Sequence, residues 1–228
     1  MRKLLSVQEI KNSDWPGILQ KSLGDNLVSA FVHGDCLMEG HDAINNPWTV
    51  SFILKDNSVN SLKKLQELLP KAQKENIEFL YFFTQDEIND SEDVFPLEFL
   101  HLANRNQAIA GNDPLKDYAP NISCLRLECE RELRGLMIHL RQAYIHLKEN
   151  RSSDGFFMQA TNTILPIMYG VFYLKFRNYP ASHDEIFRSF PGISIPERSK
   201  NVDQFVQKVD DYINAVTRII DEVDKLDV

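Results

Sequence analysis

The sequence predicts an α+β protein, in which a small mixed-sheet domain (residues 1–112) is followed by an all-α helical bundle (residues 113–228). Up to about Gly111, short apolar runs alternate with amphipathic stretches, as is typical of an α/β unit. After the turn signal Asn112-Asp113-Pro114, the apolar residues recur at helical spacing instead. The chain has 228 residues, which is long enough for two small domains that each bury a core.

The first half contains three predicted strands. Leu27–His33 is a short apolar run that ends at a glycine, Trp48–Leu54 is rich in β-branched and aromatic residues, and Ile77–Phe83 is a third run of this kind. Between the last two, a leucine stripe predicts an amphipathic helix that begins at residue 58 or 60 and ends near residue 74. Thr84-Gln85-Asp86-Glu87 has the spacing of a capping box, so a short helix should begin there.

The second half contains four predicted helices. Ser123–Lys148 carries apolar residues at helical spacing, and a helix from about Phe156 is apolar nearly all round, which predicts the centre of a bundle. Ser182-His183-Asp184-Glu185 has capping-box spacing for a short helix. The last helix places valine and isoleucine at alternating steps of four and three, at Val202, Val206, Val209, Ile213, Val216, Ile220 and Val223. This seam should pack along another helix, within the chain as we favour, or in a second copy as a homodimer through the C-terminal helix.

Composition excludes several classes of protein. The chain has 25 Lys+Arg against 33 Asp+Glu, a net charge of −8, so we expect neither nucleic acid nor a membrane as its partner. Its three cysteines form no CxxC pair and no Cys/His cluster at zinc spacing, which predicts a cytoplasmic protein with reduced thiols and no structural zinc. Residues 156–176 are long enough to span a membrane, but they include polar residues and Pro166, which favours a buried helix.

The junction after the first strand carries a family resemblance. A strand followed by Gly34 and Asp35, a loop, and a second strand resembles the opening of the nucleotidyltransferase superfamily, which has the polymerase-β-like fold. Downstream blocks are similar to bacterial nucleotidyltransferase-like proteins with a helical C-terminal half, namely Val94–Leu100, Gly111–Leu115 and Leu127–Gly135. The resemblance covers residues 23–147 and implies a nucleotidyltransferase-like domain in the first half.

The resemblance also implies where a catalytic site would lie. In that family the strand ends in Gly-Ser, which holds the nucleotide phosphates, and the next strand carries an Asp-x-Asp pair that binds Mg²⁺ together with a third carboxylate. Gly34 is present here, but Asp35 replaces the serine, and the two aspartates would fall on Pro47 and Thr49. We therefore expect a domain that has lost its metal site, with Gly34 and Asp35 as the candidate nucleotide-binding residues.

Three functional hypotheses follow. The first is a pseudoenzyme, a nucleotidyltransferase-like protein that binds a nucleotide or a protein partner without catalysis. The second is an active nucleotidyltransferase that uses ATP and Mg²⁺ to modify a small molecule or a protein, with Asp35, Asp42 and Glu78 as candidate acids. The third is a HEPN-like ribonuclease or toxin–antitoxin component, because Arg141-x4-His146 is similar to the Arg-x4–6-His motif of HEPN domains. There the histidine would act as general base and the arginine would stabilise the phosphorane.

Overall fold

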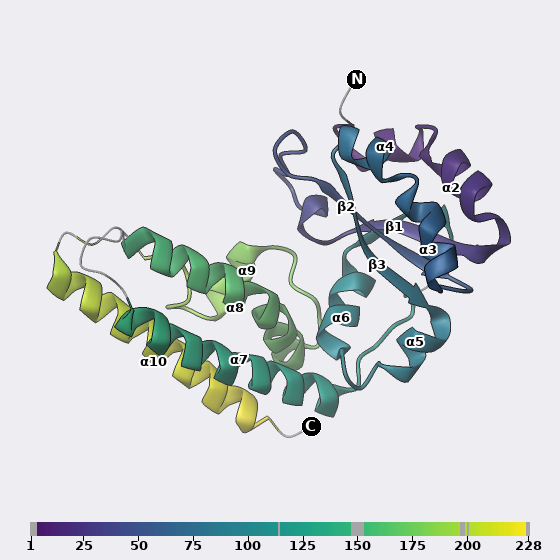
Figure 1. The fold of residues 1–228 in the computed structure, drawn as a ribbon. Coiled ribbons are helices and arrows are strands. Elements are labelled where there is room, and N and C mark those ends of the chain that lie inside the picture. Colours follow the sequence, from purple (N-terminus) through teal and green to yellow (C-terminus); the bar gives the residue numbers. More distant parts are fainter. Residues whose placement is uncertain (1–3, 114, 147–152, 197–198, 200, 227–228) are drawn as a thin grey trace. The chain divides into compact units, whose positions relative to one another are not determined.

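A computed structural model describes residues 4–113, 115–146, 153–196, 199 and 201–226 (Figure 1). It shows a mixed α/β protein with a four-stranded mixed sheet and several helices. The chain divides into two compact units: Met1–Glu92 with Glu98–Ala119, and Asp93–Leu97 with Pro120–Val228. The first contains the sheet, and the second contains the long helices.

The sheet has the strand order β3-β2-β1-β4. Strand β1 (Leu27–His33) pairs antiparallel with β2 (Trp48–Leu54) and with β4 (Asn106–Gly111), while β2 pairs in parallel with β3 (Ile77–Thr84). The predictions of β1 and β2 are confirmed to the residue, and β3 is one residue longer than predicted. β4 was not predicted from the sequence, and only Ile109 of this strand is buried.

Alternation along the strands divides the sheet between two cores. Ala30 and Val32 of β1 belong to the larger core, together with apolar residues of four helices: α1 (Val7–Lys11), α2 (Trp15–Leu23), α3 (Val59–Gln66) and α4 (Leu69–Lys74). Phe31 of β1 points to the other core, which also contains Ile53 of β2. This second core is completed from α5 (Gln85–Asp90) and α6 (Pro96–Asn104).

The helix predicted from residue 58 or 60 to residue 74 is two helices, α3 and α4. Pro70 lies in the first turn of α4 and has no N–H to donate, so it suits a helix start and interrupts a continuous helix. The predicted capping box of α5 is confirmed, because Thr84 Oγ1 accepts from the Glu87 amide at 3.1 Å and Glu87 Oε2 accepts from the Thr84 amide at 2.8 Å.

The second unit contains four helices among its described residues. These are α7 (Ile122–Ile145), α8 (Ser153–Phe176), α9 (His183–Ser189) and α10 (Val202–Asp224). They confirm the four predicted helices, although α7 is capped by Asn121, and its predicted end at Lys148 lies outside the described residues. Helix α7 packs against both α8 and α10. No helix in the described part of the chain is both long enough and apolar enough to cross a membrane.

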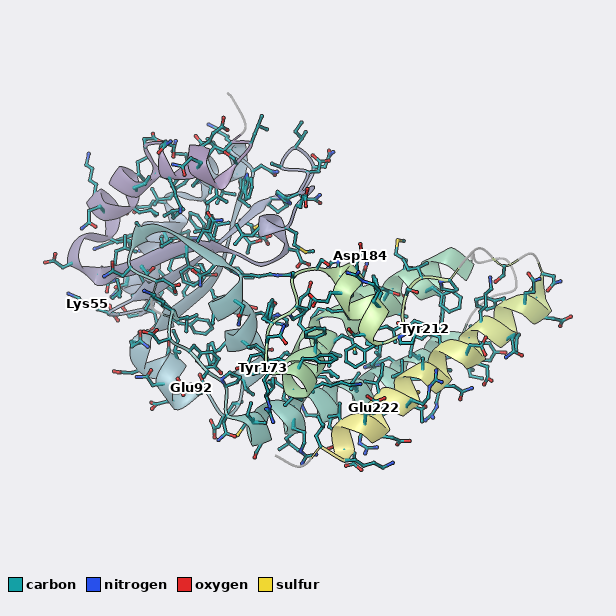
Figure 2. All side chains as sticks on the ribbon, turned by 180° about the vertical axis from the view of Figure 1, so that it is seen from behind. Lys55, Glu92, Tyr173, Asp184, Tyr212 and Glu222 are labelled. Carbon is teal, nitrogen blue, oxygen red and sulfur yellow. The ribbon has the colours of Figure 1, made fainter. Side chains whose placement is uncertain are left out.

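The valine–isoleucine seam of α10 is covered over only part of its length. Val209, Val216, Ile220 and Val223 are buried within the unit. Tyr212 is buried beside them, and its ring centroid lies 5.8 Å from that of Phe157 in α8 (Figure 2). At the start of the helix, by contrast, Val202 is 73% and Val206 is 40% exposed. Most of the seam therefore packs inside the chain.

Candidate functional site

The turn after β1 holds the two candidate nucleotide-binding residues. Gly34 has φ 84°, in the left-handed region that favours glycine, and it begins the short 3-10 helix η2 (Gly34–Leu37). The Gly34 amide donates to the Arg105 carbonyl at 3.0 Å, and Arg105 Nη1 donates to Asp35 Oδ1 at 2.9 Å. Arg105 therefore holds both Gly34 and Asp35 in place. A phosphate that accepted from the Gly34 amide would have to displace the hydrogen bond from this amide to the Arg105 carbonyl.

At this turn the carboxylate of Asp35 is more exposed to solvent than the guanidinium of Arg105. The Asp35 side chain is 75% exposed, whereas the Arg105 side chain is only 12% exposed. An approaching anion therefore meets the carboxylate before the guanidinium that neutralises it. Binding of a triphosphate here needs either a bridging cation or movement of Asp35 away from Gly34.

The other candidate acids do not gather at this turn. Glu78 is exposed on β3 and pairs in register with Thr49 of β2, one of the positions where the resemblance calls for an aspartate. Asp42 accepts hydrogen bonds from the Asn45 side chain and from the amide of Ile44. Both bonds lower the pKa of its carboxyl, and the bond from the Asn45 side chain has the larger effect. Within the described ranges, no three His, Cys, Asp or Glu side chains form a group that could hold a metal ion. The structure therefore does not bring Asp35, Asp42 and Glu78 together as a metal-binding group.

A buried polar cluster that was not predicted from the sequence lies at the end of β1. His33 Nε2 is 2.7 Å from Ser51 Oγ, and Ser51 Oγ accepts a hydrogen bond from the Tyr81 amide at 3.0 Å. The His33 ring stacks on Tyr81, with centroids 5.6 Å apart. His33 and Ser51 are hydrogen-bonded as a catalytic base and a nucleophile would be. Ser51 is 0% exposed, however, so a substrate cannot reach its hydroxyl. The signal in the sequence was a histidine and a serine interrupting neighbouring apolar strands.

Cys36 belongs to the same end of β1. Its Sγ donates to the His33 carbonyl at 3.0 Å, and its side chain is buried. Burial is the largest cause that raises the pKa of the Cys36 thiol. Since the thiolate is the reactive form, a buried thiol with a raised pKa is a poor nucleophile, and we assign Cys36 a packing role.

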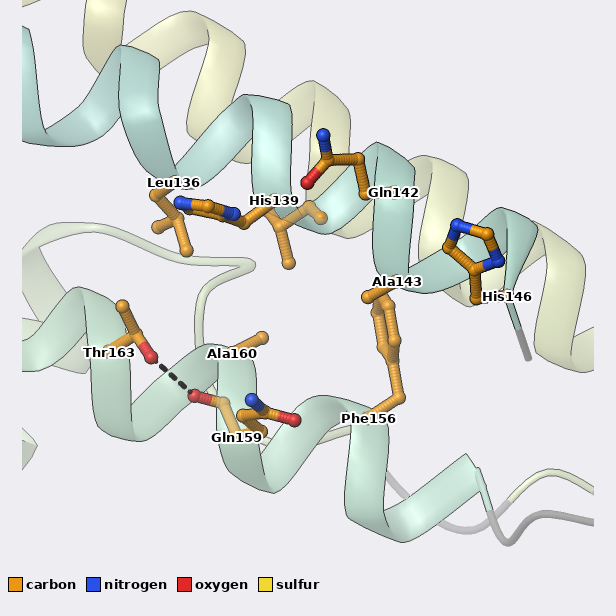
Figure 3. A pocket seen from close by; sticks show the side chains of 10 residues that line it. Leu136, His139, Gln142, Ala143, His146, Phe156, Gln159, Ala160 and Thr163 are labelled. Atoms are coloured by element: carbon orange, nitrogen blue, oxygen red, sulfur yellow. Dashed lines mark hydrogen bonds between the residues drawn. The ribbon is translucent and has the colours of Figure 1, made fainter.

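The two residues of the ribonuclease hypothesis lie on different faces of α7. His146 lines a pocket of about 380 Å³ between α7 and α8 (Figure 3), whereas Arg141 lines a separate pocket between α7 and α10. The reason is helical geometry, because residues five apart on an α-helix are rotated by about 140° from each other. The structure therefore does not bring Arg141 and His146 together, and His139 is the histidine that shares the pocket with His146.

The α7–α8 pocket has a mixture of apolar and polar walls. Ala143 and Ala160 lie on opposite sides, and their short side chains leave the space open (Figure 3). Polar groups around it come from the imidazoles of His139 and His146, from two glutamines and from a threonine hydroxyl, while Phe156 supplies an aromatic wall. None of its described lining residues is Asp, Glu, Lys or Arg. Such a pocket suits a small uncharged molecule with hydrogen-bonding groups.

No protein-family model matches the chain, and no curated protein matches it either.

Proposed function

We propose that the first unit is a nucleotidyltransferase-like domain without a metal site, and that the protein is a binding module for a nucleotide or a protein partner. The strand order supports the proposal. β2 lies antiparallel beside β1 after the Gly34 loop, and β3 lies parallel beside β2, so the strands that would carry the catalytic acids are neighbours. The helices α7, α8 and α10 constitute, in this proposal, a C-terminal bundle.

The observation that carries the proposal is the composition of β2. Metal-dependent phosphoryl transfer needs carboxylate oxygens from this strand, because Mg²⁺ prefers hard oxygen ligands that converge on the phosphates. Trp48–Leu54 contains no acidic residue. Its second residue is Thr49, and the residue before the strand is Pro47. The nearest acid to the phosphate-binding turn, Asp35, is engaged by Arg105.

A two-part experiment tests the proposal. The purified full chain is incubated with labelled ATP, GTP, CTP or UTP and with Mg²⁺ or Mn²⁺, and we expect no covalent nucleotidyl product on the chain or on added proteins. The same nucleotides are then titrated in a thermal-shift assay, in which a ligand that binds the folded state raises Tm. A rise in Tm identifies a nucleotide as the ligand, and its absence with all four leaves a protein partner as the proposed ligand.

A covalent nucleotidyl product would overturn this proposal in favour of the active transferase. In that case Asp35→Ala and Glu78→Ala should each abolish the product, because the transferase hypothesis assigns metal binding to these acids. Cleavage of RNA by the purified chain, lost on His146→Ala, would instead support the HEPN-like ribonuclease or toxin–antitoxin hypothesis. The separation of Arg141 from His146 on α7 argues against that outcome.

A further inference from the structure

Helix α7 carries an exposed stripe in which apolar residues and arginines share one face. The stripe residues follow one another at steps of four and three, and they are Leu127, Arg131, Arg134, Ile138, Arg141 and Ile145. Leu127 is 62%, Ile138 is 56% and Ile145 is 75% exposed. Large apolar side chains aligned on a surface mark an interaction site, and arginine is enriched in protein interfaces. We call these six residues the basic stripe of α7.

Helix α10 carries a stripe of the opposite charge. Its residues are exposed, follow the same steps of four and three, and are Asp203, Gln207, Asp210, Asn214, Thr217 and Asp221. Three of the six are aspartates and none is basic, whereas three of the six in the basic stripe are arginines. We call this set the acidic stripe of α10.

The two stripes lie side by side on one face of the second unit. Arg134, Ile138 and Arg141 line a pocket of about 290 Å³ whose opposite wall includes Thr217 and Asp221. The helices run in opposite directions, so the start of α10 lies toward the end of α7 (Figure 1). The unit therefore presents a single face with a basic half and an acidic half.

We propose that this face binds a second copy of the chain, with the basic stripe of each α7 lying on the acidic stripe of the other α10. A two-fold axis along the boundary between the stripes places each half of the face opposite its complement, as an isologous dimer requires. The exposed isoleucines of α7 are covered in the same contact. The dimer does not depend on the proposed function, and it uses a different face of α10 from the valine–isoleucine seam.

Arg141 is the residue at the centre of the proposed contact. Ile138 and Ile145 flank it along the stripe, and both are exposed. Arg131 and Arg134 pair with glutamates of their own helix, at 3.1 Å to Glu132 and 2.8 Å to Glu130. Among the described residues, no carboxylate lies within ion-pair distance of Arg141. Its charge is thus available to an aspartate of the second copy. That aspartate is Asp221, because the two-fold axis places each residue of α7 opposite the α10 residues that line the same pocket.

Charge also decides against other occupants of this face. An anionic membrane or a nucleic acid would be attracted by the three arginines but repelled by the adjoining aspartates of α10 and by the net charge of −8. An acidic helix of another protein would be repelled in the same way by the acidic stripe of α10, which forms half of the face. A second copy alone supplies both a basic and an acidic half in the correct relative positions.

The test is a charge-exchange experiment on the full chain, read by analytical ultracentrifugation. The wild-type chain should form dimers. Arg141→Glu places glutamate opposite Asp221, and Asp221→Arg places arginine opposite Arg141, so each variant should self-associate at least about tenfold more weakly. An equimolar mixture of the two should recover the dimer, because every contact in the mixed pair again joins opposite charges. Arg188→Glu on α9 makes the same charge change outside the stripes and should leave the dimer unchanged.

Three results would overturn the proposal. One is a wild-type chain that stays monomeric up to millimolar concentration. Another is a dimer that both single variants retain, which would place the interface elsewhere. The third is failure of the mixture to recover the dimer although circular dichroism shows both variants folded. If the chain is monomeric and binds vesicles containing phosphatidylserine, with binding lost in Arg141→Glu, the occupant is an anionic lipid surface and the proposed dimer is wrong.

Discussion

His33 of β1 and Ser51 of β2 form a buried cross-strand hydrogen bond, with Nε2 and Oγ 2.7 Å apart. Because Ser51 Oγ accepts from the Tyr81 amide, its own proton is directed toward the imidazole. Burial lowers the pKa of His33 to about 4, so the ring is neutral at neutral pH and its Nε2 accepts this proton. With the Tyr81 amide, the pair joins three of the four strands, β1, β2 and β3, and it depends on an uncharged imidazole.

Acid should therefore destabilise the fold through His33. The pKa of His33 is about 6.5 in the unfolded chain and about 4 in the folded chain. Between these two pH values the unfolded chain binds the proton and the folded chain does not. The unfolding free energy is therefore fully present above this window and falls as pH decreases through it. At pH 4.5 the loss attributable to His33 should be about 2 kcal/mol relative to pH 7. Urea denaturation at the two pH values measures it, and His33→Gln should show a smaller difference. Equal pH dependence in both proteins would contradict the assignment.

Glu128 of α7 is the second buried group on which stability should depend. It is 5% exposed, and its Oε2 accepts from the Leu97 amide in the first turn of α6 at 2.8 Å. Glu128→Ala leaves this amide without that acceptor and should cost about 2 kcal/mol of unfolding free energy. Glu132→Ala, four residues further along the same helix and half exposed, should cost less than about 0.5 kcal/mol. Equal losses in the two variants would show that the Leu97 contact contributes nothing.

The elements that the sequence predicts best are those whose pattern is local. β1 and β2 are short runs of mostly apolar residues, and α5 has both halves of its capping box within four residues. β4 has no such pattern, since Asn106–Gly111 buries only Ile109 and forms a strand through its pairing with β1. The interruption between α3 and α4 was predictable from Pro70, which the leucine stripe obscured.

The site is less predictable because its contacts join distant residues. Arg105 lies 70 positions from Asp35, and no periodicity in the sequence indicates that it binds this carboxylate. The separation of Arg141 from His146, by contrast, follows from their spacing on a helix and could have been recognised before the structure. The absence of acidic residues from β2 could be read directly from the sequence, and it is the main support for the proposal that the first unit has no metal site.

Gly111 should be intolerant of any side chain. Its φ is 73°, and a Cβ added there would lie 2.1 Å from the carbonyl oxygen of Val28, across the β4–β1 pair. Gly111→Ala should therefore lower the unfolding free energy by about 2 kcal/mol or more. Gly17 in α2 is the matched control, because an added Cβ meets nothing within 4 Å. Gly17→Ala should raise stability by about 0.5 kcal/mol, and thermal melts of the two variants should move in opposite directions.

Asp35 provides the sharpest distinction between a metal ligand and a charge that opposes nucleotide binding. If the binding module takes a nucleotide, Asp35→Asn removes the exposed negative charge beside Gly34 that an approaching phosphate would meet first. Affinity for ATP without Mg²⁺ should then rise about two- to fivefold, as expected for one partly screened charge. Isothermal titration calorimetry measures this, with Asp25→Asn, an exposed aspartate before β1, as the control of equal charge. If Asp35→Asn instead weakens binding only when Mg²⁺ is present, Asp35 is a metal ligand and the domain has kept a metal site.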